Sequence, residues 1–356
     1  MNEIWIVGAT GRVGRAVAAQ LAARHALVLV GRDPARLRGL ADKVGGQPRT
    51  VVAGSVDAVV AELARSRPAV VVNLIGPFAE TGPPIVRACP PGTHYVDLAN
   101  ELFAVTGLLG SHDEAVAAGQ SVVTGAGFGV LATESVVLKL CADRPSPARV
   151  RVDALPMTET EPGVFGTALA GTMVEALAPG GRRYQHGRLV RARLGGDVER
   201  LTLPGGSTVQ TAGVPAGELE AARRASGASS VIAASSQVPS GRVIRAVLPA
   251  AAALLSLPAL RGAAKRRLAR VRLTPRARSR GFSWAHARVE DHDGNAREGW
   301  LRAGEGMAYT ASVAAEVATR LARNEGRPGA YTPGALFGPE LAVRAGGRFI
   351  LGREAS

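Results

Sequence analysis

The sequence predicts an α/β fold: a doubly wound parallel sheet, followed by a second α+β domain with a mixed or antiparallel sheet. In the first third of the chain, short runs rich in Val and Ile alternate with helix-like stretches. That alternation is typical of parallel strands covered by helices on both faces. After Gly125 the alternation stops, which indicates a change of architecture. The chain has 356 residues, of which 46% are hydrophobic, enough for two domains with buried cores.

Strands of the first domain are expected at residues 4–7, 27–30, 50–53, 70–74, 95–98 and 121–124. In the second domain we expect a helix at 132–142 and strands at 149–155, 188–194, 198–203, 229–234, 282–290 and 296–302. The polar segment 291–295 between the last two strands contains Gly294 and predicts a hairpin. A final helix is expected over 307–322. We place the domain boundaries at 1–128, 129–305 and 306–356.

A glycine-rich loop follows the first strand, with Gly8, Gly11 and Gly14 spaced three residues apart. Glycine lets the backbone approach a pyrophosphate closely, and the free N–H groups of the helix that begins at Arg12 attract phosphate. A strand before the loop, a helix after it and a second strand beyond predict a Rossmann-type dinucleotide site. The expected contacts are Gly8, Thr10, Gly11, Arg12, Val13 and Gly14.

The end of the second strand indicates which dinucleotide binds. NAD-specific sites usually place a carboxylate there for the ribose hydroxyls. Here the first charged residue is Arg32, and Arg36 follows one helical turn later. A guanidinium group suits a 2′-phosphate, so we predict NADP(H). Asp33 keeps NAD open as the alternative, although it could equally cap the helix that opens at Pro34. After the fourth strand, Asn73, Gly76, Pro77 and Phe78 are expected to line the ribose and nicotinamide.

Three further segments make the sequence recognisable: 73–78 (Asn-Leu-Ile-Gly-Pro-Phe), 82–89 and 92–101. With 331–341 and the segment around 248–272, they resemble the saccharopine dehydrogenase-like oxidoreductases, most closely the trans-acting enoyl reductase branch. The stretch 127–134 differs from that family's pattern: Gly129 replaces the first Asp, the Pro is lost, and Glu134 stands near the second Asp. The resemblance implies a C-terminal helix that returns to the first domain, a substrate cleft between the domains, and hydride transfer from NADPH.

Candidates for proton transfer are Tyr95 and Asp97, because they have the same side-chain parity on the fifth strand. The alternative is that Tyr95 packs in the core and Asp97 caps the next segment. Glu101 and Phe128 are the residues expected in the substrate cleft. The Tyr-x-x-x-Lys pair of short-chain reductases is absent.

We therefore expect an NADPH-dependent enoyl reductase that transfers hydride to an activated C=C bond of an acyl or carrier-bound substrate. Two alternatives stay open. One is C=N reduction or amine oxidation of the saccharopine dehydrogenase type. The other is a catalytically degraded nucleotide-binding scaffold or sensor.

The net charge of +14 is concentrated in one region. Between Glu220 and Glu290 there is no acidic residue but fourteen basic ones, and the rest of the chain is balanced. Within the basic segment 246–280, an apolar stripe at Leu257, Leu260, Ala264, Leu268 and Val271 predicts an amphipathic helix surrounded by arginines. Three interpretations stay open: a core-packed helix with a solvated basic face, docking of an acidic acyl-carrier protein, or contact of residues 261–280 with anionic lipid.

Composition argues against several other partners. Aromatic residues make up 4%, which disfavours nucleic acid, and the six histidines and two cysteines show no metal-ligand spacing. Without a signal peptide or a long apolar run, we expect a cytoplasmic protein, with peripheral membrane contact left open. A homodimer is also left open.

Overall fold

The computed structural model describes residues 3–158, 163–164, 174, 180–238, 254–255, 257–273 and 281–352. The chain divides into two compact units. One comprises Met1–Ala99, Phe103–Phe128 and Met307–Ala345, and the other comprises Asn100–Leu102, Gly129–Gly306 and Gly346–Ser356. The expected C-terminal region 306–356 is therefore split, because its last strand pairs with the second sheet.

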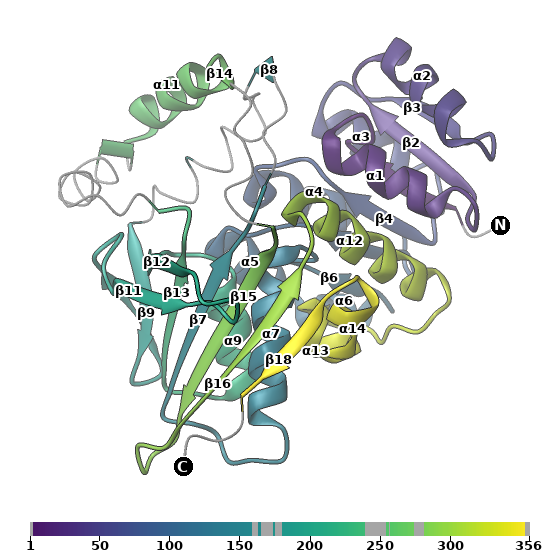
Figure 1. Cartoon of the computed structure of the whole chain (residues 1–356). Coiled ribbons are helices and arrows are strands. Elements are labelled where there is room, and N and C mark those ends of the chain that lie inside the picture. The colour runs from purple at the N-terminus through teal and green to yellow at the C-terminus, as the bar shows by residue number, and fades with distance from the viewer. Residues whose placement is uncertain are drawn as a thin grey trace. The chain divides into compact units, whose positions relative to one another are not determined.

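The first unit contains a seven-stranded parallel sheet with the order β17-β6-β5-β4-β1-β2-β3 (Figure 1). Its strands are β1 (Ile4–Val7), β2 (Leu27–Gly31), β3 (Arg49–Val52), β4 (Val70–Asn73), β5 (His94–Asp97), β6 (Ser121–Val123) and β17 (Gly329–Tyr331). Its helices are α1 (Arg12–Leu21), α2 (Pro34–Val44), α3 (Val56–Leu63), α4 (Phe78–Ala88), α5 (Leu102–Leu109), α6 (His112–Ala117), α12 (Gly306–Ala322), α13 (Pro333–Phe337) and α14 (Glu340–Arg344). This confirms the doubly wound parallel sheet.

Successive side chains of the central strands point to opposite faces of the sheet, and so they pack against different helices. Trp5 and Val7 of β1 pack in one cluster with Leu63 of α3, Ile85 of α4 and Leu108 of α5. The intervening residues of β1 are also fully buried. A strand that is buried on both faces has to lie in the middle of a sheet covered by helices on each side. Burial on both faces therefore explains the near-continuous apolar runs in the sequence.

The second unit contains a nine-stranded mixed sheet, with β7 and β13 parallel and the other pairs antiparallel. Its strands are β7 (Arg149–Leu155), β9 (Gly181–Gln185), β10 (Arg188–Ala192), β11 (Glu199–Thr202), β12 (Thr208–Gly213), β13 (Ser230–Ser235), β15 (Ser283–Glu290), β16 (Ala296–Ala303) and β18 (Arg348–Leu351). A separate pair is formed by β8 (Gly163–Val164) and β14 (Arg272–Leu273). Its helices include α7 (Phe128–Cys141), α9 (Glu218–Ser226) and α11 (Pro258–Ala269). The α+β class and the hairpin between β15 and β16 are confirmed.

Several elements of this unit differ from the sequence-based expectation. Helix α7 begins at Phe128 rather than at residue 132, and α9, β8, β9, β12, β14 and β18 were not predicted. Strands β9 and β12 carry mostly polar or half-buried side chains, so hydrophobic periodicity gives little signal for them. Strand β18 pairs with β16, which places the end of the described chain on this sheet.

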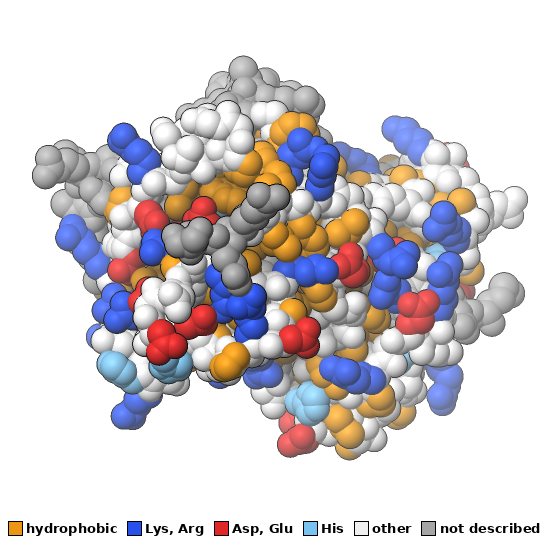
Figure 2. Space-filling view, turned by 60° about the horizontal axis from the view of Figure 1, so that its bottom comes forward, with side chains coloured by type: hydrophobic (Ala, Val, Ile, Leu, Met, Phe, Trp, Pro, Cys, Tyr) orange, Lys and Arg blue, Asp and Glu red, His pale blue; other side chains and the backbone are white. Residues whose placement is uncertain are grey.

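Within the predicted basic segment, residues 246–253, 256 and 274–280 lie outside the described part of the chain. The described part forms α11, and the predicted apolar stripe is only partly covered. Leu257 is 53% exposed, Leu260 44% and Val271 44%. On the face shown in Figure 2, Lys and Arg side chains are spread among acidic and apolar ones rather than gathered in one patch. No helix among the described residues is long and apolar enough to cross a membrane.

Candidate functional site

The glycine loop between β1 and α1 has the geometry that a pyrophosphate requires. Gly8 has a φ of +88°, which favours glycine, and its N–H donates to Val30 O of the neighbouring strand. The N-cap of α1 is Gly11, which offers no side chain to cap the helix. The first N–H groups of α1 are therefore available to an anion at its N-terminus.

Gly14 shows how closely this loop and α1 approach each other. A Cβ at this position would lie 2.5 Å from Gly8 O and 2.6 Å from Ala9 O, both backbone atoms. Only glycine permits this contact. The side chain of Val13 is buried, so its contribution to a ligand would come from the backbone, whereas Thr10 and Arg12 are half-buried. The residues present therefore fit a dinucleotide.

At the end of β2, the structure separates the roles of the two charged residues. Asp33 is the N-cap of α2, and its Oδ1 accepts hydrogen bonds from the backbone N–H groups of Ala35 and Arg36. Its Oδ2 lies 3.6 Å from Arg36 Nε. Arg32 is exposed at the carboxyl end of the strand. The carboxylate is thus engaged locally, and Arg32 remains the group suited to a 2′-phosphate.

A buried polar network links β4, α4 and β5. Asn73 Nδ2 donates to Thr81 Oγ1 at 3.1 Å and to Tyr95 OH at 3.0 Å. Tyr95 OH donates to Asp97 Oδ2 at 3.0 Å. The other carboxylate oxygen of Asp97 accepts from Thr124 Oγ1 and from the N–H groups of Ala99 and Gly125. The network therefore fixes the loops that leave β4, β5 and β6.

Burial determines what Tyr95 and Asp97 can do. Both side chains point to one face, yet Tyr95 is 1% exposed and Asp97 is fully buried. Burial raises the pKa of Asp97 to about 6, and burial together with the Asp97 carboxylate raises the pKa of Tyr95 well above its ordinary value. The Tyr95 proton is held within the network. This geometry supports a positioning role for both residues.

Three other predicted residues are also packed into the fold. Phe78 begins α4 and packs against Ala99 and Val105, while Gly76 and Pro77 are half-buried before it and are joined by a cis peptide bond. Phe128 makes an edge contact with the ring of Tyr309. Glu101 is 4% exposed and forms a β-bridge with Ala216.

A second buried carboxyl group, which the sequence did not indicate, belongs to Glu218 at the start of α9. The amide nitrogen of Asn100 donates to its Oε2 at 2.8 Å and to its Oε1 at 3.2 Å. A Cβ added at Gly129 would overlap Glu218 Oε1. Burial raises the pKa of Glu218 to about 7. Sequence reasoning missed it because α9 was not predicted and about 90 residues separate Gly129 from Glu218.

The second sheet contains a further polar cluster around Asp153 of β7. His286 Nδ1 lies 3.0 Å from Asp153 Oδ2, and Thr211 Oγ1 donates to Asp153 Oδ1 at 2.6 Å. Arg151 also pairs with Asp153. The hydrogen bonds from His286 and Arg151 keep the pKa of Asp153 low despite its burial. Both carboxylate oxygens of Asp153 thus have partners inside the sheet, as in a structural cluster, and His286 Nε2 lies 3.4 Å from Glu298 Oε2.

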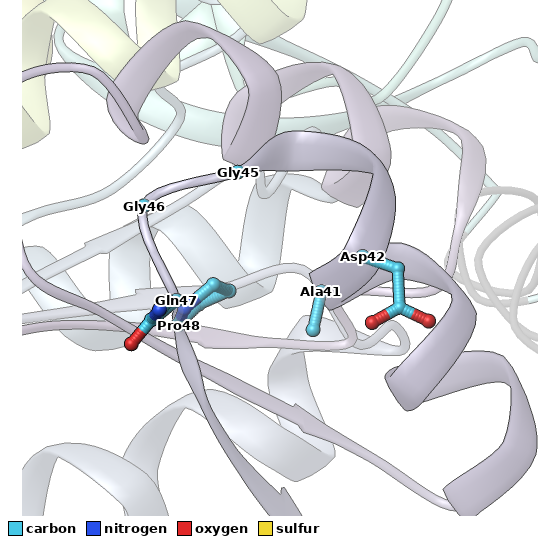
Figure 3. A pocket seen from close by; sticks show the side chains of 6 residues that line it. All are labelled: Ala41, Asp42, Gly45, Gly46, Gln47 and Pro48. Carbon is cyan, nitrogen blue, oxygen red and sulfur yellow. The ribbon is translucent and has the colours of Figure 1, made fainter.

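A shallow hollow of about 370 Å³ lies at the end of α2, lined by Ala41, Asp42, Gly45, Gly46, Gln47 and Pro48 (Figure 3). It precedes β3 and so lies at the amino edge of the parallel sheet. Dinucleotides bind at the opposite, carboxyl edge, so this hollow is separate from the glycine loop. Among the described residues, no cluster of His, Cys, Asp and Glu is suited to hold a metal ion.

Comparison with known proteins identifies the class of the first domain. Residues 4–123 match the family model of the saccharopine dehydrogenase NADP-binding domain. Residues 4–123 are thus similar to an NADP-binding domain, and the predicted cofactor, NADP, is confirmed.

Named relatives agree with the resemblance. A trans-acting enoyl reductase of Mycobacterium ulcerans is 36% identical over 135 residues, covering 35% of this chain and 32% of that protein. A putative trans-acting enoyl reductase of Mycobacterium tuberculosis is 29% identical over 185 residues, covering 49% of this chain and 44% of that protein. The matches thus span less than half the length of these relatives.

The fold as a whole resembles a solved structure. A saccharopine dehydrogenase (L-Glu forming) from Saccharomyces cerevisiae superposes with a TM-score of 0.60 at 14% identity, covering 98% of this chain and 100% of that one. At this identity the likeness concerns the fold. It agrees with a parallel sheet combined with a mixed sheet.

Proposed function

We propose that this protein is an NADPH-dependent oxidoreductase that reduces an activated C=C bond in an acyl or carrier-bound substrate. The observation that carries the proposal is the NADP-binding domain whose named relatives are trans-acting enoyl reductases. The buried Asn73–Asp97 network supports it, because it would hold the carboxyl edge of the sheet rigid beside a nicotinamide.

Bound NADPH would supply the hydride, so the chain itself has to bind the cofactor, orient the substrate and provide a proton. The glycine loop and the N-terminus of α1 would hold the pyrophosphate, and Arg32, with Arg36 nearby, would bind the 2′-phosphate. The backbone of Asn73, Gly76, Pro77 and Phe78 would line the ribose and nicotinamide. Tyr95 and Asp97 would keep these loops in place, and Glu101 and Phe128 stay candidates for shaping the substrate region.

NADPH oxidation with a panel of α,β-unsaturated acyl thioesters of increasing length tests the proposal. We expect turnover with at least one thioester and none with the saturated analogues. Turnover only with an amino acid plus an aldehyde or keto acid would instead favour C=N reduction. NADPH binding without turnover on any panel would favour a scaffold or sensor.

We further propose that α11 docks on an anionic membrane surface from which an acyl substrate could be reached. Leu260, Arg266 and Arg267 lie on α11, with Leu257 at its N-cap and Arg270 at its C-cap, and these side chains are exposed. Exposed leucines beside arginines offer a lipid interface both apolar and electrostatic contacts. Since no acidic residue lies between Glu220 and Glu290, nothing within that stretch of sequence neutralises these arginines.

Vesicle flotation tests this surface. We expect binding to vesicles containing phosphatidylserine, little binding to phosphatidylcholine alone, and loss of binding at high salt. An Arg266→Gln/Arg267→Gln/Arg270→Gln variant should lose binding, whereas the control Arg65→Gln, in the turn after α3, should keep it. Binding to an acidic acyl-carrier protein but not to either vesicle would replace the lipid with a carrier protein as the partner.

A further inference from the structure

The carboxyl group of Glu218 is held by a segment that directly follows β5. Gly217 N donates to Asn100 O at 2.8 Å, and Glu101 forms a β-bridge with Ala216. The Asn100 amide then contacts both carboxyl oxygens of Glu218. Backbone and side chain together position this carboxyl group, which is 4% exposed.

Gly129 provides the space that the carboxyl group occupies. A Cβ at Gly129 would overlap Glu218 Oε1 and lie 3.2 Å from the Asn100 side chain. The backbone of Gly129 needs no left-handed conformation, since it lies in α7 and is not among the residues of positive φ. What requires glycine here is the closeness of Glu218. The Glu218 carboxyl group of α9 thus fills the space that a side chain at position 129 of α7 would occupy.

Both segments that meet at Glu218 leave the carboxyl edge of the parallel sheet. Asn100 is the third residue after Asp97, the last residue of β5, and Gly129 is the sixth after Val123, the last residue of β6. In open α/β sheets, ligands bind outside the carboxyl ends of the strands. The segments that hold this carboxyl group therefore follow, within a few residues, the ends of strands beside which the nicotinamide is expected.

We propose that Glu218 is the acid–base residue of this site and donates the proton that accompanies hydride transfer. The inference rests on the proposed reduction. NADPH gives a hydride to one carbon of the C=C bond, and the π electrons form a new C–H bond with the Glu218 proton at the other carbon. NADP⁺, a saturated product and a Glu218 carboxylate remain, and the carboxylate regains a proton from water.

The electrostatics of the group suit this role. Burial raises the pKa of Glu218 to about 7, opposed by its own backbone N–H and by the Asn100 amide. The nearby carboxyl group of Glu101 accepts a hydrogen bond from Asn100 N. A general acid works best when its pKa lies near the working pH. Tyr95 lacks this property, since its proton is committed to Asp97.

Titration of the Glu218 carboxyl by ¹³C NMR or difference infrared spectroscopy tests the proposal without any substrate. The signal is assigned by its loss in Glu218→Gln. A carboxyl close to the nicotinamide should have a lower pKa with NADP⁺, whose ring is positively charged, than with NADPH, by about half a unit or more. Equal pKa values in the two complexes would overturn the proposal.

The second test moves the carboxyl group from position 218 to position 129. Glu218→Gln keeps shape and NADPH affinity, and it should lower turnover on the order of 10²-fold and abolish the loss of activity above neutral pH. Glu218→Ala combined with Gly129→Asp should recover at least tenfold over Glu218→Ala alone, because the carboxyl returns from the other element. The exposed Glu114→Gln is the control and should match the wild type.

The outcomes separate this inference from the proposed function. The wild type could reduce an enoyl thioester while Glu218→Gln keeps the same turnover and pH profile. That result would overturn the role of Glu218 as proton donor and leave the proposed reduction in place. A cofactor-dependent titration without reduction of any thioester would leave Glu218 as the acid–base residue and reject the substrate class.

Discussion

Arg32 and Asp33 are neighbours at the end of β2 but have different roles. Asp33 accepts two backbone hydrogen bonds at the start of α2, so its carboxylate stabilises the helix. We propose that the exposed guanidinium of Arg32 distinguishes NADPH from NADH. The sequence left both options open for Asp33, and only the cap geometry separates them.

Replacing Arg32 with Ala should therefore weaken NADPH binding and leave NADH binding nearly unchanged. A charge-assisted contact of this kind contributes about 1.5–3 kcal/mol, or roughly ten- to a hundredfold in affinity. Fluorescence titration with each cofactor measures the change, with Arg65→Ala as the control. A parallel loss for both cofactors would show that Arg32 does not contact the 2′-phosphate.

Tyr95 contributes to stability through its hydrogen bonds in the buried network. Tyr95→Phe would leave Asp97 Oδ2 without its donor and remove one acceptor from Asn73. We expect a loss of about 1–3 kcal/mol in the free energy of unfolding, measured by urea denaturation. Tyr331→Phe, which removes a hydroxyl that donates only to an exposed carbonyl, should cost less. Comparable losses in both variants would contradict this account.

At the scale of elements, the parallel strands and α1 could be predicted from sequence, because buried apolar runs and glycine spacing are local signals. The same is true of the hairpin between β15 and β16. Helix α9 and strand β12 could not, because α9 buries Glu218 and Glu220 and β12 carries Thr and Gln side chains, so neither shows a clear apolar pattern. Glu218 became part of the site only because a missing side chain at Gly129 and a hydrogen bond from Asn100 coincide in space.

The close approach of α1 to the glycine loop gives a prediction for the element as a whole. Gly14→Ala should displace α1 from backbone oxygens of Gly8 and Ala9, lowering stability by about 1–3 kcal/mol and abolishing NADPH binding. Gly39→Ala, within α2 and with nothing near its Cβ, should instead stabilise by up to about 1 kcal/mol. Thermal unfolding and NADPH titration measure both. Wild-type binding by Gly14→Ala would contradict the loop geometry.

For the whole molecule, the buried Glu218 makes stability depend on pH. Between the ordinary glutamate pKa of 4.5 and the folded value of about 7, the folded protein holds a proton that the unfolded chain releases. The free energy of unfolding therefore falls as pH rises through this window and stays lower above it. Asp97, with its pKa raised to about 6, contributes with the same sign.

Glu218→Gln removes the ionising group, so its stability relative to the wild type should increase between pH 5 and pH 8, by about 2 to 3 kcal/mol. Urea denaturation at the two pH values measures this, and the Asp97 contribution is common to both proteins. A constant difference between variant and wild type across this range would show that Glu218 titrates normally in the fold.

The proposed reduction is tested by deuterium transfer from NADPH labelled at C4 of the nicotinamide to an α,β-unsaturated acyl thioester. Mass spectrometry of the product should show one deuterium per reduced molecule, transferred from only one of the two C4 faces. Oxidation of the labelled NADPH with no deuterium in any acyl product would contradict the proposed reduction.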